Sequence, residues 1–542
     1  MRELSYFFLI ILLCSISTGC KKDKTKDDQH GEVVINSDGT ELSGRVSTSD
    51  AGVIFIDPDG IANKKTTADT STNEYPLELV ASVSAPIHQG DTLRATHVEI
   101  NGNYAYISYN MEGAKYKGAI DVFNISAAIT PQLVTSVIFP TIDISAIAYL
   151  DNKLFIAGAK DVNSSSSATS PAIVGYLQLQ NGVPTSTFQS AHLPSFAGTG
   201  VIASDNKVYV TTGTTGGVYV INPANLQTTG STTLSDARSV AANSTYYAVL
   251  TGSNGVNIYN KSGNGLVKNI SLGTDLAEAK RTMDFNSEYL VIANGKGGIK
   301  YYNVNSGSKT GEITLPTSLP GVLNNDDIVT NAVSYNNQLI FAANGAAGTY
   351  VCTENTNNHS LKLVGAFGFG IGNSINYVKS KDNFLFVASG RGGLKIMKII
   401  PATIASSCTS LPTYTGGNNL NVSQNQNLQY KGSVTLHSSV IQGTLFYCGT
   451  MALTKDLDVK SGGTLTVQGS LVTGAPNKYL KVDGGGKLKI QGNLTIYGNL
   501  QLASNSTLEF VGTNNTVAIY GTVTKGTNVT ITGTYTDVNG KL

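Results

Sequence analysis

Short apolar stretches alternate with glycine-rich turns along most of this chain. The stretch Asn383–Lys398, N-F-L-F-V-A-S-G-R-G-G-L-K-I-M-K, is an apolar run, a glycine turn and a second apolar run. Apolar runs of this length bounded by glycine predict β-strands, and the tight turn between them predicts a hairpin. Variants of this unit recur, so the pattern predicts an all-β chain built from a repeated hairpin.

The hairpin motif repeats between residues 75 and 400. Its copies are Asn103–Asn110, Asn152–Gly158, Asn206–Val220, Tyr247–Tyr259, Tyr289–Tyr302, Gln338–Val351 and Asn383–Ile396. The turn glycines Gly213, Gly252, Gly295, Gly345 and Gly390 lie 39, 43, 50 and 45 residues apart. With one more strand expected on each side of the motif, this spacing is typical of propeller blades. Seven copies predict a seven-bladed β-propeller.

The two ends of this region predict how the ring closes. The last copy of the motif lacks an outer strand, whereas Pro76–Val83 precedes the first complete unit. Pro76–Val83 is similar to Pro131–Val137, the expected outer strand of the first blade. We therefore expect Pro76–Val83 to complete the seventh blade, which leaves no open sheet edge in the ring.

Two stretches resemble a known family of repeats. Asn103–Ile107 (N-Y-A-Y-I) followed by Gly118–Ser126 (G-A-I-D-V-F-N-I-S) is similar to the LVIVD repeat of bacterial surface proteins, and Gly392–Ile396 is a second match. The resemblance covers about residues 75–400 and implies a propeller without catalytic residues. Most copies lack the aspartate that Asp121 supplies in the first, so this is a divergent example.

A different repeat follows a Pro- and Ser/Thr-containing linker at 401–417. Leu457–Gly469 aligns with Leu480–Gly492, and the same pattern recurs in Leu500–Gly512 and Val517–Gly521. Apolar and polar residues alternate in these segments, so each strand buries one face. The offset between copies matches one coil of a parallel β-solenoid-like domain over 418–542. An antiparallel sandwich is the alternative that the pattern leaves open.

The N-terminus resembles a bacterial lipoprotein signal peptide at residues 1–20. The apolar run Tyr6–Leu13 is too short to span a bilayer and is followed by Ser17-Thr18-Gly19-Cys20, which is similar to a lipobox, although Ser17 departs from the commoner Leu. The resemblance implies acyl chains on Cys20 that anchor the mature chain in an outer membrane. Ordinary signal cleavage that leaves a free Cys20 is the alternative.

Residues 21–74 are polar, and we predict a tether with at most one short hairpin. The run Lys21–Asp28 (K-K-D-K-T-K-D-D) resembles the charged tags of lipoproteins displayed on the outer face of the outer membrane. We therefore expect a cell-surface protein, with the periplasmic face as the alternative location.

Composition excludes some classes of partner. Lys and Arg number 37 against 36 Asp and Glu, and this balance gives no argument for a nucleic acid partner. The sequence contains no H-E-x-x-H, no G-x-S-x-G and no phosphate loop, and its six histidines are scattered. We therefore predict no metal, no cofactor and no catalytic residue.

Aligned on their turns, the blades place one polar residue near the start of each inner strand: Thr96, Ser145, Thr199, Arg238, Arg281, Asn331 and Asn376. In propellers this end of the strand faces the channel mouth, and Lys296 and Arg391 lie in turns on the same side. Such a basic cluster is suited to a carboxylate or sulfate. The alternative is that these residues only solvate the channel end.

Acid–base candidates and cysteines complete the list of reactive residues. His97, Glu99 and Asp284 are the ionisable residues with acid–base potential on inner strands, and we assign them structural roles. Cys408 and Cys448 form either a disulfide or two free thiols, since spacing alone does not establish geometry. Cys352 lies in a predicted strand and is expected to be an inert buried thiol.

These observations predict a surface-anchored lipoprotein that acts as a non-enzymatic binding or scaffolding module through its propeller face. Its protein or glycan partner is not identified by the sequence. The alternative is a glycan-binding or glycan-processing component of an outer-membrane uptake system. The 26 tyrosines offer stacking surfaces for sugars, although the chain has no tryptophan.

Overall fold

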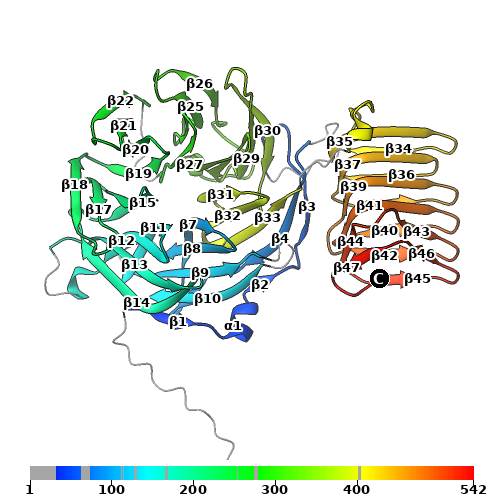
Figure 1. The fold of residues 1–542 in the computed structure, drawn as a ribbon, viewed down its shortest axis with the longest axis horizontal. Coiled ribbons are helices and arrows are strands. Elements are labelled where there is room, and N and C mark those ends of the chain that lie inside the picture. Colours follow the sequence, from blue (N-terminus) through cyan, green and yellow to red (C-terminus); the bar gives the residue numbers. More distant parts are fainter. Residues whose placement is uncertain are drawn as a thin grey trace, which may run out of the picture.

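The computed structural model describes residues 32–62, 74–111, 113, 115–126, 131–164, 169–252, 254–273, 279–370, 372–400 and 405–542. Its two domains are a ring of antiparallel sheets and a stack of parallel coils (Figure 1). The predicted signal peptide, Cys20 and the charged run Lys21–Asp28 lie outside these residues. The predicted seven-bladed propeller is confirmed.

Each blade runs from an inner strand at the channel to an outer strand at the periphery. The inner strands are β7 (Arg94–Asn101), β11 (Ile142–Leu150), β15 (Gly198–Ser204), β19 (Ala237–Ala242), β23 (Met283–Asn286), β27 (Ile328–Asn336) and β31 (Tyr377–Lys381). The second strands are β8 (Tyr104–Asn110), β12 (Lys153–Lys160), β16 (Lys207–Thr212), β20 (Tyr246–Thr251), β24 (Tyr289–Ala293), β28 (Leu339–Gly345) and β32 (Phe384–Ala388).

The third strands are β9 (Gly118–Asn124), β13 (Ala172–Gln180), β17 (Gly217–Ile221), β21 (Val256–Asn260), β25 (Ile299–Asn303), β29 (Thr349–Glu354) and β33 (Leu394–Ile399). The outer strands are β10 (Gln132–Phe139), β14 (Val183–His192), β18 (Thr228–Thr233), β22 (Leu266–Ile270), β26 (Lys309–Ile313), β30 (Leu361–Phe367) and β4 (Leu77–Val83). The second strands are apolar on both faces because neighbouring blades cover both sides of the sheet, whereas outer strands such as β18 are largely exposed.

The ring closes as predicted, because β4 pairs with β33 in the seventh blade. The two strands are antiparallel, with Val83 opposite Leu394 and Leu77 opposite Ile399. A short hairpin, β5 (Ile87–His88) with β6 (Asp91–Thr92), then leads from β4 to the first inner strand. Inner strands β31 and β7 also pack together, so no blade edge is left open between the first and last blades.

The expectation of a tether over 21–74 is wrong for residues 32–62. Here β1 (Val34–Asn36) pairs with β10, while β2 (Val46–Ser47) and β3 (Gly52–Ile54) pair with β4, and the short helix α1 (Gly39–Ser43) joins β1 to β2. The sequence did not predict these strands, because each is only two or three residues long and lies in a polar segment. They pair with the outer edge of a blade and do not need the apolar pattern of a core strand.

Arg45 fastens this segment to the first blade. Its guanidinium donates two hydrogen bonds to the fully buried Asp121 carboxylate, at 3.0 and 2.5 Å, and its Nε donates to the Ser84 carbonyl at 3.1 Å. Paired donors of this geometry compensate the desolvation of a buried carboxylate. Asp121 is the residue that most other copies of the repeat lack, and its partner belongs to the N-terminal segment.

The C-terminal domain is a parallel β-solenoid, which excludes the antiparallel sandwich. One face consists of β34 (Asn419–Val422), β36 (Ser438–Ile441), β38 (Leu457–Val459), β40 (Tyr479–Val482), β42 (Asn499–Leu502) and β45 (Val523–Lys525). The other face consists of β35 (Asn427–Leu436), β37 (Thr444–Leu453), β39 (Thr464–Thr473), β41 (Lys487–Ile496), β43 (Thr507–Phe510), β44 (Asn515–Ile519), β46 (Thr530–Thr532) and β47 (Tyr535–Asp537). All pairings within these sheets are parallel.

Register places like residues above one another in successive coils. Leu465 lies opposite Leu488 and Val467 opposite Ile490, so the apolar side chains form one continuous buried column. Gly469 stacks on Gly449 with a φ of 136°, and a Cβ there would lie 2.1 Å from the Gly449 carbonyl oxygen. This column therefore requires glycine at the bend.

Residues 405–417, the described part of the expected linker, cap the first coils of the solenoid. The 3₁₀ turn η4 (Ser406–Cys408) carries Cys408, and Cys408 forms a disulfide with Cys448 of β37. Thr413 also forms a parallel bridge with Lys431. The disulfide alternative is thus confirmed over two free thiols, and Cys352 is a buried free cysteine as expected.

The two domains share a packed interface at the seventh blade. Val53 N donates to the Gly474 carbonyl oxygen at 3.2 Å, and Val53, Ile400, Val472 and Tyr497 belong to one buried cluster. Glu78 of β4 is also buried there, where it accepts a 3.0 Å hydrogen bond from the Tyr497 hydroxyl. Burial raises the pKa of Glu78, opposed by Lys398 at 3.7 Å.

We expect Arg45→Ala to destabilise the propeller by about 3–5 kcal/mol, because it leaves the Asp121 carboxylate buried without a cation. Differential scanning calorimetry of the full chain would show a lower midpoint for the propeller transition. Lys309→Ala is the control, since Lys309 pairs with Glu312 on the surface and such pairs contribute about 0–1 kcal/mol. Equal effects of the two substitutions would contradict the role of Arg45.

The disulfide closes a loop with a sequence separation of 40 residues. By loop entropy, its removal in Cys408→Ser should destabilise the solenoid by up to about 4 kcal/mol. A reductant should lower the unfolding midpoint of the wild type but leave that of Cys408→Ser unchanged, because the variant has no such bond to reduce. A midpoint of the wild type that ignores the reductant would refute this stabilising role.

Candidate functional site

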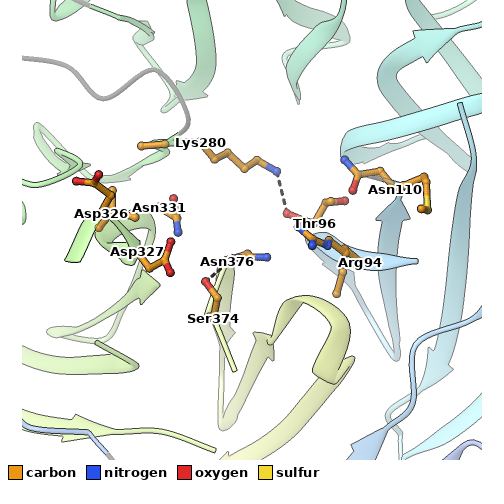
Figure 2. A pocket seen from close by; sticks show the side chains of 13 residues that line it. Arg94, Thr96, Asn110, Lys280, Asp326, Asp327, Asn331, Ser374 and Asn376 are labelled. Carbon is orange, nitrogen blue, oxygen red and sulfur yellow. Dashed lines mark hydrogen bonds between the residues drawn. The ribbon is translucent and has the colours of Figure 1, made fainter. Parts of the chain in front are cut away.

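The mouth of the central channel contains two adjoining cavities, of about 410 and 400 Å³. Both lie where the inner strands begin, and both are lined by Thr96, Asn110, Ala279 and Lys280. The first cavity continues toward blades six and seven, along Asp326, Asp327, Asn331, Ser374 and Asn376 (Figure 2). The second continues toward blades three and four, along residues that include Ser145, Phe196, Thr199 and Arg238.

Most of the predicted polar ring is built from hydrogen bonds between neighbouring blades. Four of its side chains donate to a main-chain carbonyl of the next blade: Thr96 to Ile144 at 3.0 Å, Thr199 to Ala237 at 2.7 Å, Arg238 to Ala279 at 3.1 Å and Asn331 to Ile375 at 3.4 Å. Three of the acceptors, Ile144, Ala237 and Ile375, directly precede the predicted ring residue of their own blade. The fourth acceptor, Ala279, directly precedes Lys280. By the same spacing, Lys280 and not Arg281 occupies the ring position of blade five.

Lys280 crosses the mouth and separates the two cavities. Its nitrogen Nζ donates to the carbonyl oxygen of Thr96 at 2.8 Å (Figure 2) and to that of Ser145 at 2.6 Å, so blade five contacts blades one and two directly. The same nitrogen lies 5.2 Å from the centroid of the Tyr377 ring. Lys280 is half-buried, and the loss of hydration at its amine lowers the pKa of Lys280 to about 7.

The floor beneath Lys280 is aromatic and uncharged. The ring of His97 packs on that of Tyr377 with centroids 4.3 Å apart. Burial lowers the pKa of His97 well below its ordinary value, and the positive charges of Lys280 and Lys379 lower it further. His97 is therefore a neutral imidazole at physiological pH.

A charged network lies farther along the channel. Lys379 Nζ lies 3.9 Å from Asp284 Oδ2, and this carboxylate raises the pKa of Lys379. Asp284 also accepts a hydrogen bond from the main-chain nitrogen of Tyr335 at 3.0 Å. Burial raises the pKa of Glu99. These contacts support the structural roles that the sequence predicted for His97, Glu99 and Asp284.

The structure does not bring the predicted basic residues together as one cluster. Arg281 is 1% exposed and lies in the wall between blades four and five, where it donates to Gly252 O at 3.1 Å and Asn294 Oδ1 at 3.0 Å. The expectation that Arg281 faces the mouth is wrong, because its left-handed backbone (φ 53°) delays the start of β23 to Met283 and redirects the side chain.

The other predicted residues divide between the cavities and their surroundings. Arg238, Asn331 and Asn376 line the cavities, and Arg238 also donates two hydrogen bonds to the Asp236 carboxylate, at 3.1 and 2.7 Å. Lys296 pairs with Asp326, and Arg391 lies in the 3₁₀ turn η3 (Gly390–Gly392). Neither Lys296 nor Arg391 lines either cavity.

Sequence reasoning missed Lys280, Phe196 and the pair Asp326 and Asp327. The one available signal was the dipeptide Lys280-Arg281. Because the number of residues between blades varies, either residue of this pair fits the ring position of blade five in the alignment. Phe196 is 69% exposed, an unusual state for a phenylalanine in the wall of a cavity, and nothing in its local sequence distinguishes it.

In the described part of the chain, no group of three or more His, Cys, Asp or Glu side chains is arranged to hold a metal ion. No helix among the described residues is long and apolar enough to cross a membrane.

Comparison with known proteins finds similarity to solved structures alone. No family model and no curated protein matches the sequence. Solved structures similar to this one include U3-55K, at 12% identity over 61% of this chain and 98% of that chain, with a TM-score of 0.43. The WD40 β-propeller domain of Doa1 matches at 11% identity over 59% and 97%, with a TM-score of 0.40. The computationally designed Ika8 protein matches at 12% identity over 65% and 97%, with a TM-score of 0.38.

The lowered pKa of Lys280 predicts a pH dependence of stability. Its pKa falls from 10.5 to about 7 on folding, so above pH 7 the unfolded chain holds more protons than the folded one. The free energy of unfolding should therefore rise with pH between 7 and 9, by up to about 1.4 kcal/mol per unit. Urea titrations of the wild type and Lys280→Met should show this rise in the wild type only. A parallel rise in both proteins would contradict it.

Proposed function

We propose that this chain is a non-enzymatic binding protein whose ligand enters the channel mouth of the propeller. The observation that carries the proposal is the pair of cavities around Lys280, into which side chains from most blades converge. A concave site with a few convergent polar groups is the usual form of a small-ligand site. The remaining channel charges are engaged with one another and with main-chain groups, so the mouth is the part of the channel available to a ligand.

We further propose that the protein is an outer-membrane lipoprotein displayed on the cell surface. The lipobox-like Ser17–Cys20, the following charged run and the similarity of blades one and seven to LVIVD repeats support this location. The Cys408–Cys448 disulfide is a second line of support, because such bonds persist in oxidising compartments outside the cytosol.

The chemistry of the second cavity favours a glycan as the ligand. Hydroxyl groups of Thr96, Ser145 and Thr199 border this cavity and suit the hydroxyl groups of a sugar. The exposed ring of Phe196 offers a flat apolar surface for stacking, the role that tryptophan commonly fills. A glycan-binding component of an outer-membrane uptake system is thus the form of the proposal that Phe196 favours.

A binding screen with matched variants tests the role of the mouth. The soluble chain from residue 21 onward would be screened on a glycan array and against cell-surface extracts. Phe196→Ala should weaken binding of a selected ligand about fivefold, since one stacked ring contributes on the order of 1 kcal/mol. Lys309→Ala is the control, because Lys309 lies on the outer strand β26 and lines neither cavity. Equal affinities of wild type and Phe196→Ala would move the site elsewhere.

The location is tested separately. Protease added to intact cells should degrade the wild type, because a surface-displayed chain is accessible to it. In a separate cell fractionation, Cys20→Ser should be released from the membrane fraction. Full protection of the wild type in intact cells would place it on the periplasmic side and contradict surface display.

A further inference from the structure

Lys280 has an unusual hydrogen-bonding environment for a lysine. Both acceptors of its Nζ are main-chain carbonyls, those of Thr96 and Ser145. Among the described residues, no carboxylate lies within ion-pair distance of Nζ. A neutral amine has two N–H groups, which match these two acceptors, and one lone pair that takes no part in either bond.

The surrounding charges leave Lys280 without an anionic partner in the described part of the mouth. In the first cavity Asp326 is engaged by Lys296, and Arg94 and Asp327 complete the charged lining. In the second cavity Asp236 is engaged by Arg238. Below the amine lie Tyr377 and the neutral His97, and beyond them Lys379 faces Asp284. A partly desolvated ammonium without a nearby anion is disfavoured relative to the free amine.

We propose that the amine of Lys280 is a covalent capture site for hydroxylated aldehydes or ketones, which it binds as an imine in the channel mouth. The inference rests on the proposed function, since it uses the same cavities. The lone pair of Nζ attacks the carbonyl carbon, and a proton passes from nitrogen to oxygen to give a carbinolamine. Loss of that oxygen as water leaves the C=N bond. The reaction releases one water, requires no oxidant or reductant, and reverses by hydrolysis.

The lowered pKa supports this chemistry. With a pKa of about 7, roughly half of the Lys280 side chains are free amines at neutral pH, whereas an ordinary lysine is less than about 0.1% unprotonated. A desolvated lysine is the usual form of an imine-forming residue. Lys379 provides an internal contrast, because Asp284 raises its pKa and keeps it protonated.

The cavities around the amine suit the rest of such a ligand. Each has a volume in the range of small-ligand sites. Asn331 and Asn376 offer amide groups in the first cavity, Ser145 and Thr199 offer hydroxyl groups in the second, and Asn110 borders both. A carbonyl compound that carries hydroxyl groups, such as the open-chain form of a sugar, matches both the amine and this lining.

Reductive trapping tests the proposal on the full soluble chain. Glycolaldehyde, a small hydroxylated aldehyde, would be added at pH 7 with cyanoborohydride, and modified lysines would be mapped by peptide mass spectrometry. We expect Lys280 to be modified at least tenfold faster than Lys296, with a half-maximal rate near pH 7. In urea the two rates should become equal, because unfolding restores the ordinary pKa of Lys280.

Two variants serve as controls. Lys280→Arg should lose the fast modification and keep the slow modification of the other lysines, whereas Lys296→Arg should keep the fast one. Modification of Lys280 no faster than that of Lys296 in the folded chain would overturn the proposal.

The same variants separate this inference from the proposed function. If trapping at Lys280 fails while Phe196→Ala still weakens ligand binding, the mouth is a non-covalent site and only the imine is refuted. If trapping succeeds while Phe196→Ala leaves ligand binding unchanged, Lys280 is carbonyl-reactive and the proposed ligand site is refuted.

Discussion

The pairing of β4 with β33 is the contact on which the rest of the structure depends. Each blade buries both faces of its sheet only because a neighbour covers each face, so the first and last blades must meet. Main-chain hydrogen bonds between β4 and β33 join residues more than 300 positions apart and complete the seventh blade. The same strand carries β2 and β3 on its outer edge and presents Glu78 to Tyr497 of the solenoid. Closure of the ring and attachment of the second domain thus use one element.

The channel mouth is a consequence of this closure. Its lining residues come from different blades and border the same cavities only in a closed ring. Inter-blade hydrogen bonds from Thr96, Thr199, Arg238 and Asn331 hold the inner strands in position, and Lys280 crosses from blade five to blades one and two. A group that spans the mouth loses its hydration, and this loss is the source of its altered protonation.

The solenoid contributes rigidity by a different principle. Successive coils place the same type of residue at the same position, so leucines lie above leucines and glycines above glycines. Such a stack is stabilised by nearest-neighbour contacts, and its first coils are the ones that a capping segment must cover. Residues 405–417 and the Cys408–Cys448 disulfide provide that cover. The shared interface at Val53 and Tyr497 then holds the stack against the seventh blade.

The sequence by itself determined the repeat architecture, because blades and coils arise from local patterns. Seven blades and their closure were predicted from the apolar runs, the turn glycines and the additional strand at Pro76–Val83. The coil was predicted from the alternation of apolar and polar residues in Leu457–Gly469 and its repeats. The polar ring was predicted at six of seven positions. The tertiary structure alone decided the seventh, because one left-handed residue, Arg281, shifts the side chains by one position and puts Lys280 in the mouth. It alone also decided the structure of residues 32–62, whose short strands have partners more than 20 positions away. Local patterns specify elements, whereas burial, charge and pKa depend on contacts between residues that are distant in sequence.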